Sequence, residues 1–227
     1  MRRMLRRLRH KAKLNWACAQ ILHHGLWFVD VPRTSSSSIR AELAGHFGSV
    51  HGKTELFEEE FAAKSLFSAH QPASRMRRIL GERAWDEIFT FTMVRNPWDR
   101  AVSLYAYRRR IADIPEEWTF RDYVLRLGEA NADTEYFQYY GYRWAAADFL
   151  VDSDGELLVD FVGRFETRER DLKHVAARVG FEGLGRLALQ AASRGKPYRE
   201  FYDSETAEVI RTLHGRDVEL FGYEFDA

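Results

Sequence analysis

The feature that most limits the fold of this chain is a short apolar run followed by a polar loop and a helix-like pattern. Residues 26–31 (LWFVDV) are nearly all apolar and rich in aromatic and β-branched side chains, which is typical of a strand buried in a parallel sheet. A polar loop, PRTSSSS, follows at 32–38. Ile39, Leu43 and Phe47 then recur at the spacing of one helix face, and Gly48 would end that helix.

The loop between the predicted strand and helix has the chemistry of an anion site. The first turn of a helix has N–H groups without acceptors, and the helix dipole favours negative charge there. Arg33 adds a permanent cation with a planar fork. Further donors come from Thr34, Ser35, Ser36, Ser37 and Ser38. An ordinary strand-to-helix turn capped by serine is the alternative interpretation.

The same loop lacks a feature of nucleoside triphosphatases. Their loop reads G-x-x-x-x-G-K-[ST], and its last hydroxyl binds Mg²⁺. Residues 32–38 contain neither those glycines nor the Lys-Ser/Thr pair. The sequence therefore favours a phosphate that is held without a metal.

A second apolar run ends in a similar polar segment. Residues 88–94 (IFTFTMV) predict another buried strand, and a helix from about 98 to 110 is expected to bury Val102, Tyr105 and Ala106. Asn96 suits the N-cap of this helix and Pro97 its first turn.

Two side chains of this second segment are candidates for another phosphate. Arg95 follows the predicted strand, at the edge where open α/β sheets bind ligands, and Ser103 lies about two turns into the helix. The alternative for Arg95 is an ion pair with Asp99. Asp99 and Arg100 themselves are expected to be helix-end and surface charges.

The remaining pattern completes an α/β fold with a mostly parallel central sheet flanked by helices. A hairpin is expected over 149–159, a strand over 160–166, a helix that Gly180 ends, and a last helix capped by Asp203. At 227 residues the chain suits one domain. We expect a helical basic segment at 1–25 and a single domain at 26–227.

Charge and cysteine content limit the partners and the compartment. Lys plus Arg equals Asp plus Glu, at 34 each, which argues against a dedicated nucleic-acid partner. Residues 1–13 are nevertheless basic and lack acids, so weak contact with an anionic membrane surface and a solvated helix end are both open. One cysteine, Cys18, and no long apolar run predict a cytoplasmic protein.

The segments FVDVPRTSSSSIRAEL and FTFTMVRNPWDRAVSLY resemble the two signatures of carbohydrate-type sulfotransferases, which use 3′-phosphoadenosine-5′-phosphosulfate (PAPS). The resemblance continues through DFVGRFE and YREFYDSETAEVI, and covers roughly residues 26–226. It implies a P-loop-like fold, PAPS as donor, a hydroxyl acceptor such as a sugar or glycoconjugate, and no metal. The first signature would hold the 5′-phosphosulfate, and Arg95 with Ser103 would hold the 3′-phosphate.

The resemblance also implies roles for other residues. Arg33 would neutralise the leaving phosphate, and His70, in a segment similar to the family's H-A-T-A, would be the catalytic base. A structural hydrogen bond is the alternative for His70. In the tail, Arg194 and Arg199 would reach the 3′-phosphate and Tyr198 would pack near the adenine, unless this loop is simply solvated.

The loop departs from the family pattern P-K-T-G-G-T-S. Arg33 replaces the lysine, and Ser35 and Ser36 replace glycines, which adds Cβ atoms where the backbone must approach a phosphate. Two alternatives to a sulfotransferase therefore stay open. One is a degenerate nucleotide-binding module without turnover, and the other is a P-loop small-molecule kinase.

Overall fold

The central sheet is fully parallel. A computed structural model describes residues 15–48, 70–129, 136–137, 142–184 and 196–225. Within these residues the strands β1 (Leu26–Val29), β2 (Phe89–Val94) and β3 (Phe161–Arg164) form a three-stranded sheet in the order β1-β2-β3. Phe28 pairs with Phe91, and Phe91 pairs with Phe161. The predicted α/β fold with a parallel sheet between helices is confirmed.

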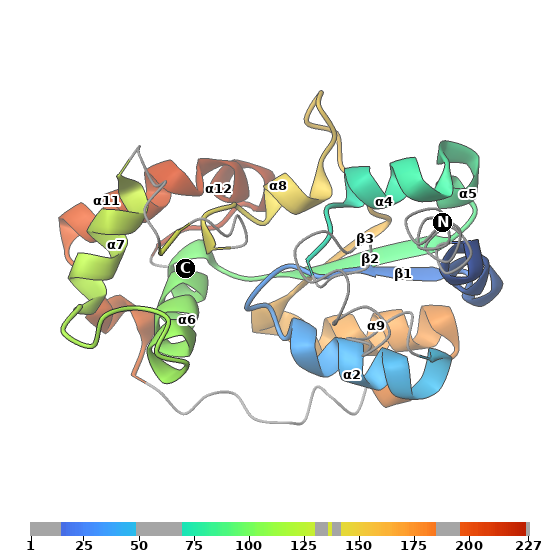
Figure 1. The fold of residues 1–227 in the computed structure, drawn as a ribbon, viewed down its shortest axis with the longest axis horizontal. Coiled ribbons are helices and arrows are strands. Elements are labelled where there is room, and N and C mark those ends of the chain that lie inside the picture. The colour runs from blue at the N-terminus through green and yellow to red at the C-terminus, as the bar shows by residue number, and fades with distance from the viewer. Residues whose placement is uncertain (1–14, 49–69, 130–135, 138–141, 185–195, 226–227) are drawn as a thin grey trace, which may run out of the picture.

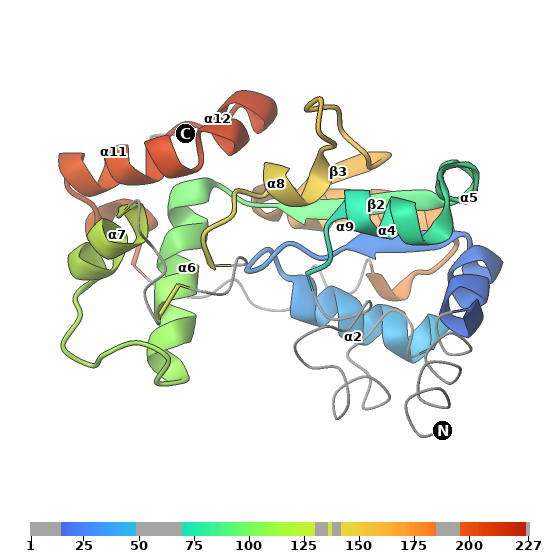
Figure 2. The same cartoon turned by 45° about the horizontal axis from the view of Figure 1, so that its top comes forward.

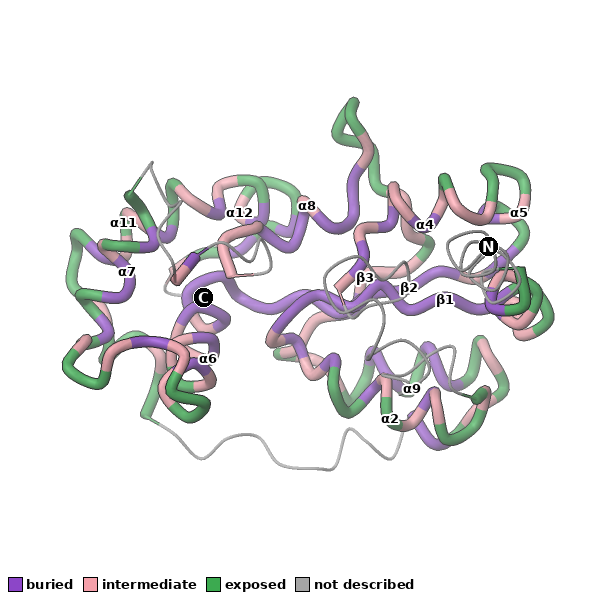
Figure 3. The backbone as a smooth tube through the Cα atoms, viewed as in Figure 1, coloured by how far each residue is buried: buried purple, intermediate pink, exposed green. Residues whose placement is uncertain are grey.

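Helices cover both faces of this sheet (Figures 1 and 2). On one face lie α2 (Ser36–Phe47) and α9 (Arg168–Val179), which bury Ile39, Leu43 and Leu172 against Phe28 and Phe91. The opposite face carries α4 (Ala73–Leu80), which is followed by the short α5 (Glu82–Asp86). β1 is therefore buried throughout and β2 from Thr90 onward (Figure 3), as their continuous apolar sequence requires, whereas β3 at the edge of the sheet is only partly buried.

A second group of helices lies beyond the carboxyl end of β2, on the left in Figure 1. It comprises α6 (Pro97–Arg110), α7 (Phe120–Gly128), α11 (Ser204–Leu213) and α12 (Gly215–Phe221). Asn96 caps α6 by accepting from the N–H groups of Trp98 and Asp99, and Asp203 caps α11, both as predicted. The indole of Trp98 donates to the carbonyl of Ala207 at 2.9 Å and joins α6 to α11.

Two local predictions are only partly right. Residues 149–159 do turn back on themselves through one antiparallel bridge between Val151 and Leu157, but Phe149 and Leu150 belong to α8 (Ala147–Leu150) and not to a strand. The buried face of α6 also differs from the predicted one. Ala106 is exposed, and the face instead buries Trp98, Ala101, Leu104 and two arginines, Arg100 and Arg108.

The N-terminal region is described only in part. Residues 15–24 are helical and lead directly into β1. Residues 1–14, which hold the basic stretch, lie outside the described residues. Among the described residues, no helix is both long enough and apolar enough to cross a membrane.

Candidate active site

The loop that joins β1 to α2 is held in an unusual backbone conformation. Arg33 has a φ of 68° and Ser35 a φ of 75°, both in the left-handed region that favours glycine. Ser35 is the N-cap of α2, but its side chain makes no capping hydrogen bond. The N–H of Ser38 donates to the carbonyl of Ser35 at 3.2 Å. The N–H groups of Ser36 and Ser37 precede it, in the turn where a helix supplies no acceptor.

The hydroxyls of the loop face different surroundings. Thr34 is buried and its hydroxyl donates to the carbonyl of Val31 at 2.9 Å, so it stabilises the loop itself. Ser36 is also buried, whereas Ser37 and Ser38 are exposed at the start of α2. The prediction that the loop is merely a serine-capped turn fits this arrangement poorly, because no serine side chain caps the helix.

Two arginines of the second segment hold the backbone of this loop. The Nε of Arg100 donates to the carbonyl of Pro32 at 3.0 Å. An Nη of Arg95 donates to the carbonyl of Arg33 at 3.3 Å. The segments that the sequence separates by about sixty residues are therefore joined through the carbonyls of consecutive loop residues.

Arg100 is not the surface charge that the sequence predicted. The residue is only 3% exposed. Both of its Nη atoms donate to the carbonyl of Trp144 at 3.0 Å, and one lies 3.9 Å from the buried carboxylate of Asp217. The guanidinium fork thus ties the loop to two other parts of the chain, and its buried charge has an acid and three hydrogen bonds to compensate it.

The side chain of Arg33 meets the helix α6. Its Nε donates to the hydroxyl of Ser103 at 3.1 Å, and its guanidinium lies 4.8 Å from the ring centre of Tyr107. Burial, followed by the charges of Arg95 and Arg110, lowers the pKa of Arg33. No described carboxylate forms an ion pair with Arg33. Arg33 and Ser103, which the sequence assigned to different phosphates, therefore come together beside other arginines.

Arg95 lies at the carboxyl end of β2, as predicted, and is 7% exposed. Its Nε donates to Asp99 at 2.8 Å, so the ion pair considered as an alternative is present. The guanidinium also stacks at 4.0 Å from the ring centre of Phe165. Its contact with the Arg33 carbonyl nevertheless keeps it beside the loop.

His70 lies close to the same edge of the sheet. Its Nδ1 is 2.9 Å from a carboxylate oxygen of Asp30 and 3.0 Å from the Asp30 carbonyl. Asp30 directly follows β1 and precedes the loop, so the predicted base is placed next to the predicted anion site. His70 also has a positive φ, of 67°. Its catalytic role remains a prediction.

Two residues near the C-terminus, Tyr198 and Arg199, lie close to the segment that follows β2. Tyr198 and Arg199 begin the 3₁₀ helix η4 (Tyr198–Phe201). The hydroxyl of Tyr198 donates to the carbonyl of Phe225 at 2.5 Å and lies 3.4 Å from the side-chain nitrogen of Asn96. Arg199 is exposed and donates to the same Phe225 carbonyl. Arg194 lies outside the described residues.

Sequence reasoning missed three residues of this region. Asp30 lies within an apolar run and fits the pattern of the predicted strand. A single carboxylate at the end of such a run could have indicated a functional residue. Arg100 reads as a surface charge beside Asp99. Tyr107, which lies between the guanidinium groups of Arg33 and Arg110, carries no sequence signal that distinguishes it from a core aromatic.

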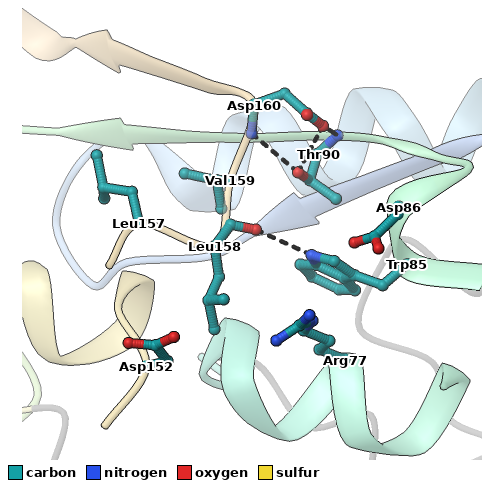
Figure 4. Close-up of a pocket in the computed structure, with 9 residues that line it drawn as sticks. All are labelled: Arg77, Trp85, Asp86, Thr90, Asp152, Leu157, Leu158, Val159 and Asp160. Carbon is teal, nitrogen blue, oxygen red and sulfur yellow. Dashed lines mark hydrogen bonds between the residues drawn. The ribbon is translucent and has the colours of Figure 1, made fainter. Parts of the chain in front are cut away.

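A pocket of about 290 Å³ opens at the opposite edge of the sheet (Figure 4). It lies at the amino ends of β2 and β3, where the carboxylate of Asp160 accepts from the N–H and hydroxyl of Thr90. The indole of Trp85 donates to the Leu158 carbonyl in its wall. None of the predicted site residues lines this pocket, so it is separate from the arginine-rich loop.

The left-handed conformation of Ser35 generates a stability prediction. Replacement of Ser35 by glycine should remove backbone strain and raise the free energy of unfolding by about 0.5–1 kcal/mol, after the entropic cost of glycine. Ser36→Gly is the matched control, because Ser36 is helical and its replacement should lower stability by about 0.5–1 kcal/mol. Urea unfolding measures both. Equal destabilisation by the two substitutions would mean that Ser35 is not strained.

Comparison with known proteins agrees with this geometry. A family model described as the sulfotransferase family matches residues 21–224. An uncharacterized protein of Archaeoglobus fulgidus is 28% identical over 109 residues, which are 48% of this chain and 82% of the relative. A search of solved structures finds no significant match. Because the family model spans the sheet, both arginine-bearing segments and the tail helices, the chain belongs to the sulfotransferase family.

Proposed function

We propose that this protein transfers a sulfuryl group from PAPS to a hydroxyl group of a sugar or glycoconjugate. Membership of the sulfotransferase family supports sulfuryl transfer in general. The observation that carries the choice of PAPS is the contact between the two predicted phosphate segments. Arg33 bonds to Ser103, and Arg95 bonds to the backbone of Arg33, so groups suited to two phosphates lie in one region.

The loop residues are proposed to hold the 5′-phosphosulfate. The N–H groups at the start of α2, the serine hydroxyls and the Arg33 guanidinium would donate to its oxygens. Arg33 has no described carboxylate partner and lies near two other arginines, so an anion would relieve the repulsion among them. In this exchange the anion would replace Ser103 as the hydrogen-bond partner of Arg33.

The 3′-phosphate is assigned to Arg95 and Ser103. To bind it, Arg95 would exchange part of its ion pair with Asp99 for a phosphate, which offers more acceptor oxygens. Tyr198 and Arg199 are proposed to approach the nucleotide from the tail, because Tyr198 already contacts Asn96, the residue after Arg95. Arg194 is assigned to the 3′-phosphate on the basis of the resemblance alone.

The proposed reaction is an in-line transfer. The acceptor oxygen forms a bond to sulfur while the bond from sulfur to the phosphate oxygen breaks, and 3′,5′-bisphosphoadenosine leaves with the electron pair. His70 would take the acceptor proton. Arg33 would neutralise the charge that develops on the departing phosphate, with help from the N-terminus of α2.

The donor assignment can be tested by ligand-induced thermal stabilisation. We expect 3′,5′-bisphosphoadenosine to raise the Tm more than 5′-AMP at equal concentration, because only the bisphosphate engages both segments. Mg-ATP should have little effect. Stabilisation by Mg-ATP with none from the bisphosphate would favour a kinase instead. Bisphosphate binding without ³⁵S transfer from PAPS to any hydroxyl acceptor of a sugar panel would favour the binding module.

The role of Arg33 can be tested in the same transfer assay. Arg33→Ala should lower turnover about 10²–10³-fold, by analogy with loss of one donor to a transition-state charge. Arg83→Ala is the matched control, because the Arg83 side chain is 95% exposed on α5, which precedes the amino end of β2, whereas Arg95 follows the carboxyl end. Turnover that is equal in the two variants would refute the assignment of Arg33.

A further inference from the structure

One carboxylate beside the proposed site has no role in the account above. Asp30 is the residue that follows β1, and its side chain is only 6% exposed. One oxygen lies 2.6 Å from an Nη of Arg40 on α2, and the other lies 2.9 Å from Nδ1 of His70. The carboxylate therefore stands between a permanent cation and the proposed base.

The neighbours of His70 determine which ring nitrogen carries its proton. Nδ1 forms its hydrogen bond with the backbone carbonyl of Asp30 at 3.0 Å, and a carbonyl can only accept. The nearest carboxylate oxygen, at 2.9 Å, places negative charge beside Nδ1 without forming an aligned hydrogen bond. Nδ1 must therefore carry a hydrogen. In the neutral ring the proton-accepting nitrogen is then Nε2.

Arg40 compensates the charge of the Asp30 carboxylate. Burial of a carboxylate away from water is costly unless a cation lies beside it. The Arg40 guanidinium, at 2.6 Å, supplies that cation without competing for the oxygen that faces His70. The backbone carbonyl of Asp30 thus accepts from Nδ1, and its nearby carboxylate can stabilise the positive ring that forms when Nε2 takes a proton.

The backbone conformation of His70 independently supports a functional role for the position of its side chain. Its φ of 67° is uncommon for a residue with a Cβ atom. Residues held in such conformations cluster at active sites, where the surrounding contacts fix a side chain at the cost of strain. The contacts to Asp30 are among those that hold the side chain here.

We propose that Asp30 is a positioning residue that holds His70 in the Nδ1–H tautomer, so that Nε2 receives the proton of the acceptor hydroxyl. This inference rests on the proposed sulfuryl transfer. In the step itself, the acceptor oxygen bonds to sulfur, the proton passes to Nε2, and the bisphosphate leaves with the electrons of the broken sulfur–oxygen bond. Asp30 remains ionised throughout.

The direct test is the tautomer, read from ¹⁵N chemical shifts of the histidine rings, with His70→Ala used to assign the His70 signals. The intact chain should show a protonated Nδ1. Asp30→Asn keeps the backbone carbonyl that accepts from Nδ1, so the ring should stay in the Nδ1–H form and lose only the negative charge beside it. A ring that is already Nε2–H in the intact chain would overturn the proposal.

A double-mutant cycle tests the consequence for turnover, measured as ³⁵S transfer from PAPS to a disaccharide panel and to water. Asp30→Asn should lower turnover about 10²–10⁴-fold, as expected when the carboxylate behind a catalytic histidine is lost. In the His70→Ala background the same change should cost less than about twofold, because Asp30 acts through His70. An undiminished cost in that background would show a merely structural role and overturn the proposal.

Two controls separate this inference from the proposed function. Asp160→Asn replaces a carboxylate at the opposite edge of the sheet, where it accepts from the N–H and hydroxyl of Thr90, and should leave turnover of the folded protein within about twofold. Binding of 3′,5′-bisphosphoadenosine should persist in every variant. If the intact chain does not bind it, the proposed function fails. If it binds and His70→Ala or Asp30→Asn turns over normally, only the role of the pair fails.

Discussion

The site depends on one buried guanidinium. The Nε of Arg100 donates to the Pro32 carbonyl and its Nη atoms donate to the Trp144 carbonyl. The carboxylate of Asp217 lies beside the same guanidinium. Because the fork is rigid and planar, it fixes the distance between the loop after β1 and the helices that follow β2. Arg100 holds the carbonyl of Pro32, and Arg95 holds the carbonyl of the next residue, Arg33. The side chain of Arg33 adds a third tie, because it bonds to Ser103 on α6.

The fixed loop explains why positive charge and backbone strain gather in one place. The chain accepts left-handed conformations at Arg33, Ser35 and His70, each of which costs stability. It also brings Arg33 near Arg95 and Arg110, whose charges disfavour the protonated form of Arg33. Both costs are reasonable for a surface that an anion completes, since an anion would accept from the strained loop and balance the guanidinium groups.

Local sequence signals predicted the elements that position the site. The apolar runs predicted β1 and β2, and the caps at Asn96 and Asp203 and the stop at Gly48 match the helices within a residue or two. These features depend on neighbouring residues, which sequence displays directly. The position of Arg95 at the carboxyl end of β2 was also anticipated, because open α/β sheets bind ligands at that edge, whereas the contact of Arg33 with Ser103 was not.

Features that depend on distant partners could not be predicted. Arginines are rarely fully buried, so the inward position of Arg100 became visible only with the carbonyls that accept from it. Ser35 resembles an N-cap by residue type, and only its φ shows that it fills a position suited to glycine. Asp30 was hidden within an apolar run because its partners, Arg40 and His70, come from later elements.

The dependence of the site on Arg100 is best tested by calorimetric titration of 3′,5′-bisphosphoadenosine into Arg100→Lys. Lysine keeps the charge but cannot span Pro32 and Trp144, so affinity should fall at least about tenfold. Arg108→Lys is the matched control, because Arg108 is buried on the same helix but bonds to Asp113 and Tyr136 instead of the loop. It should leave affinity within about twofold. Equal affinities of the two variants, or an Arg100→Lys variant that binds like the intact chain, would contradict this account.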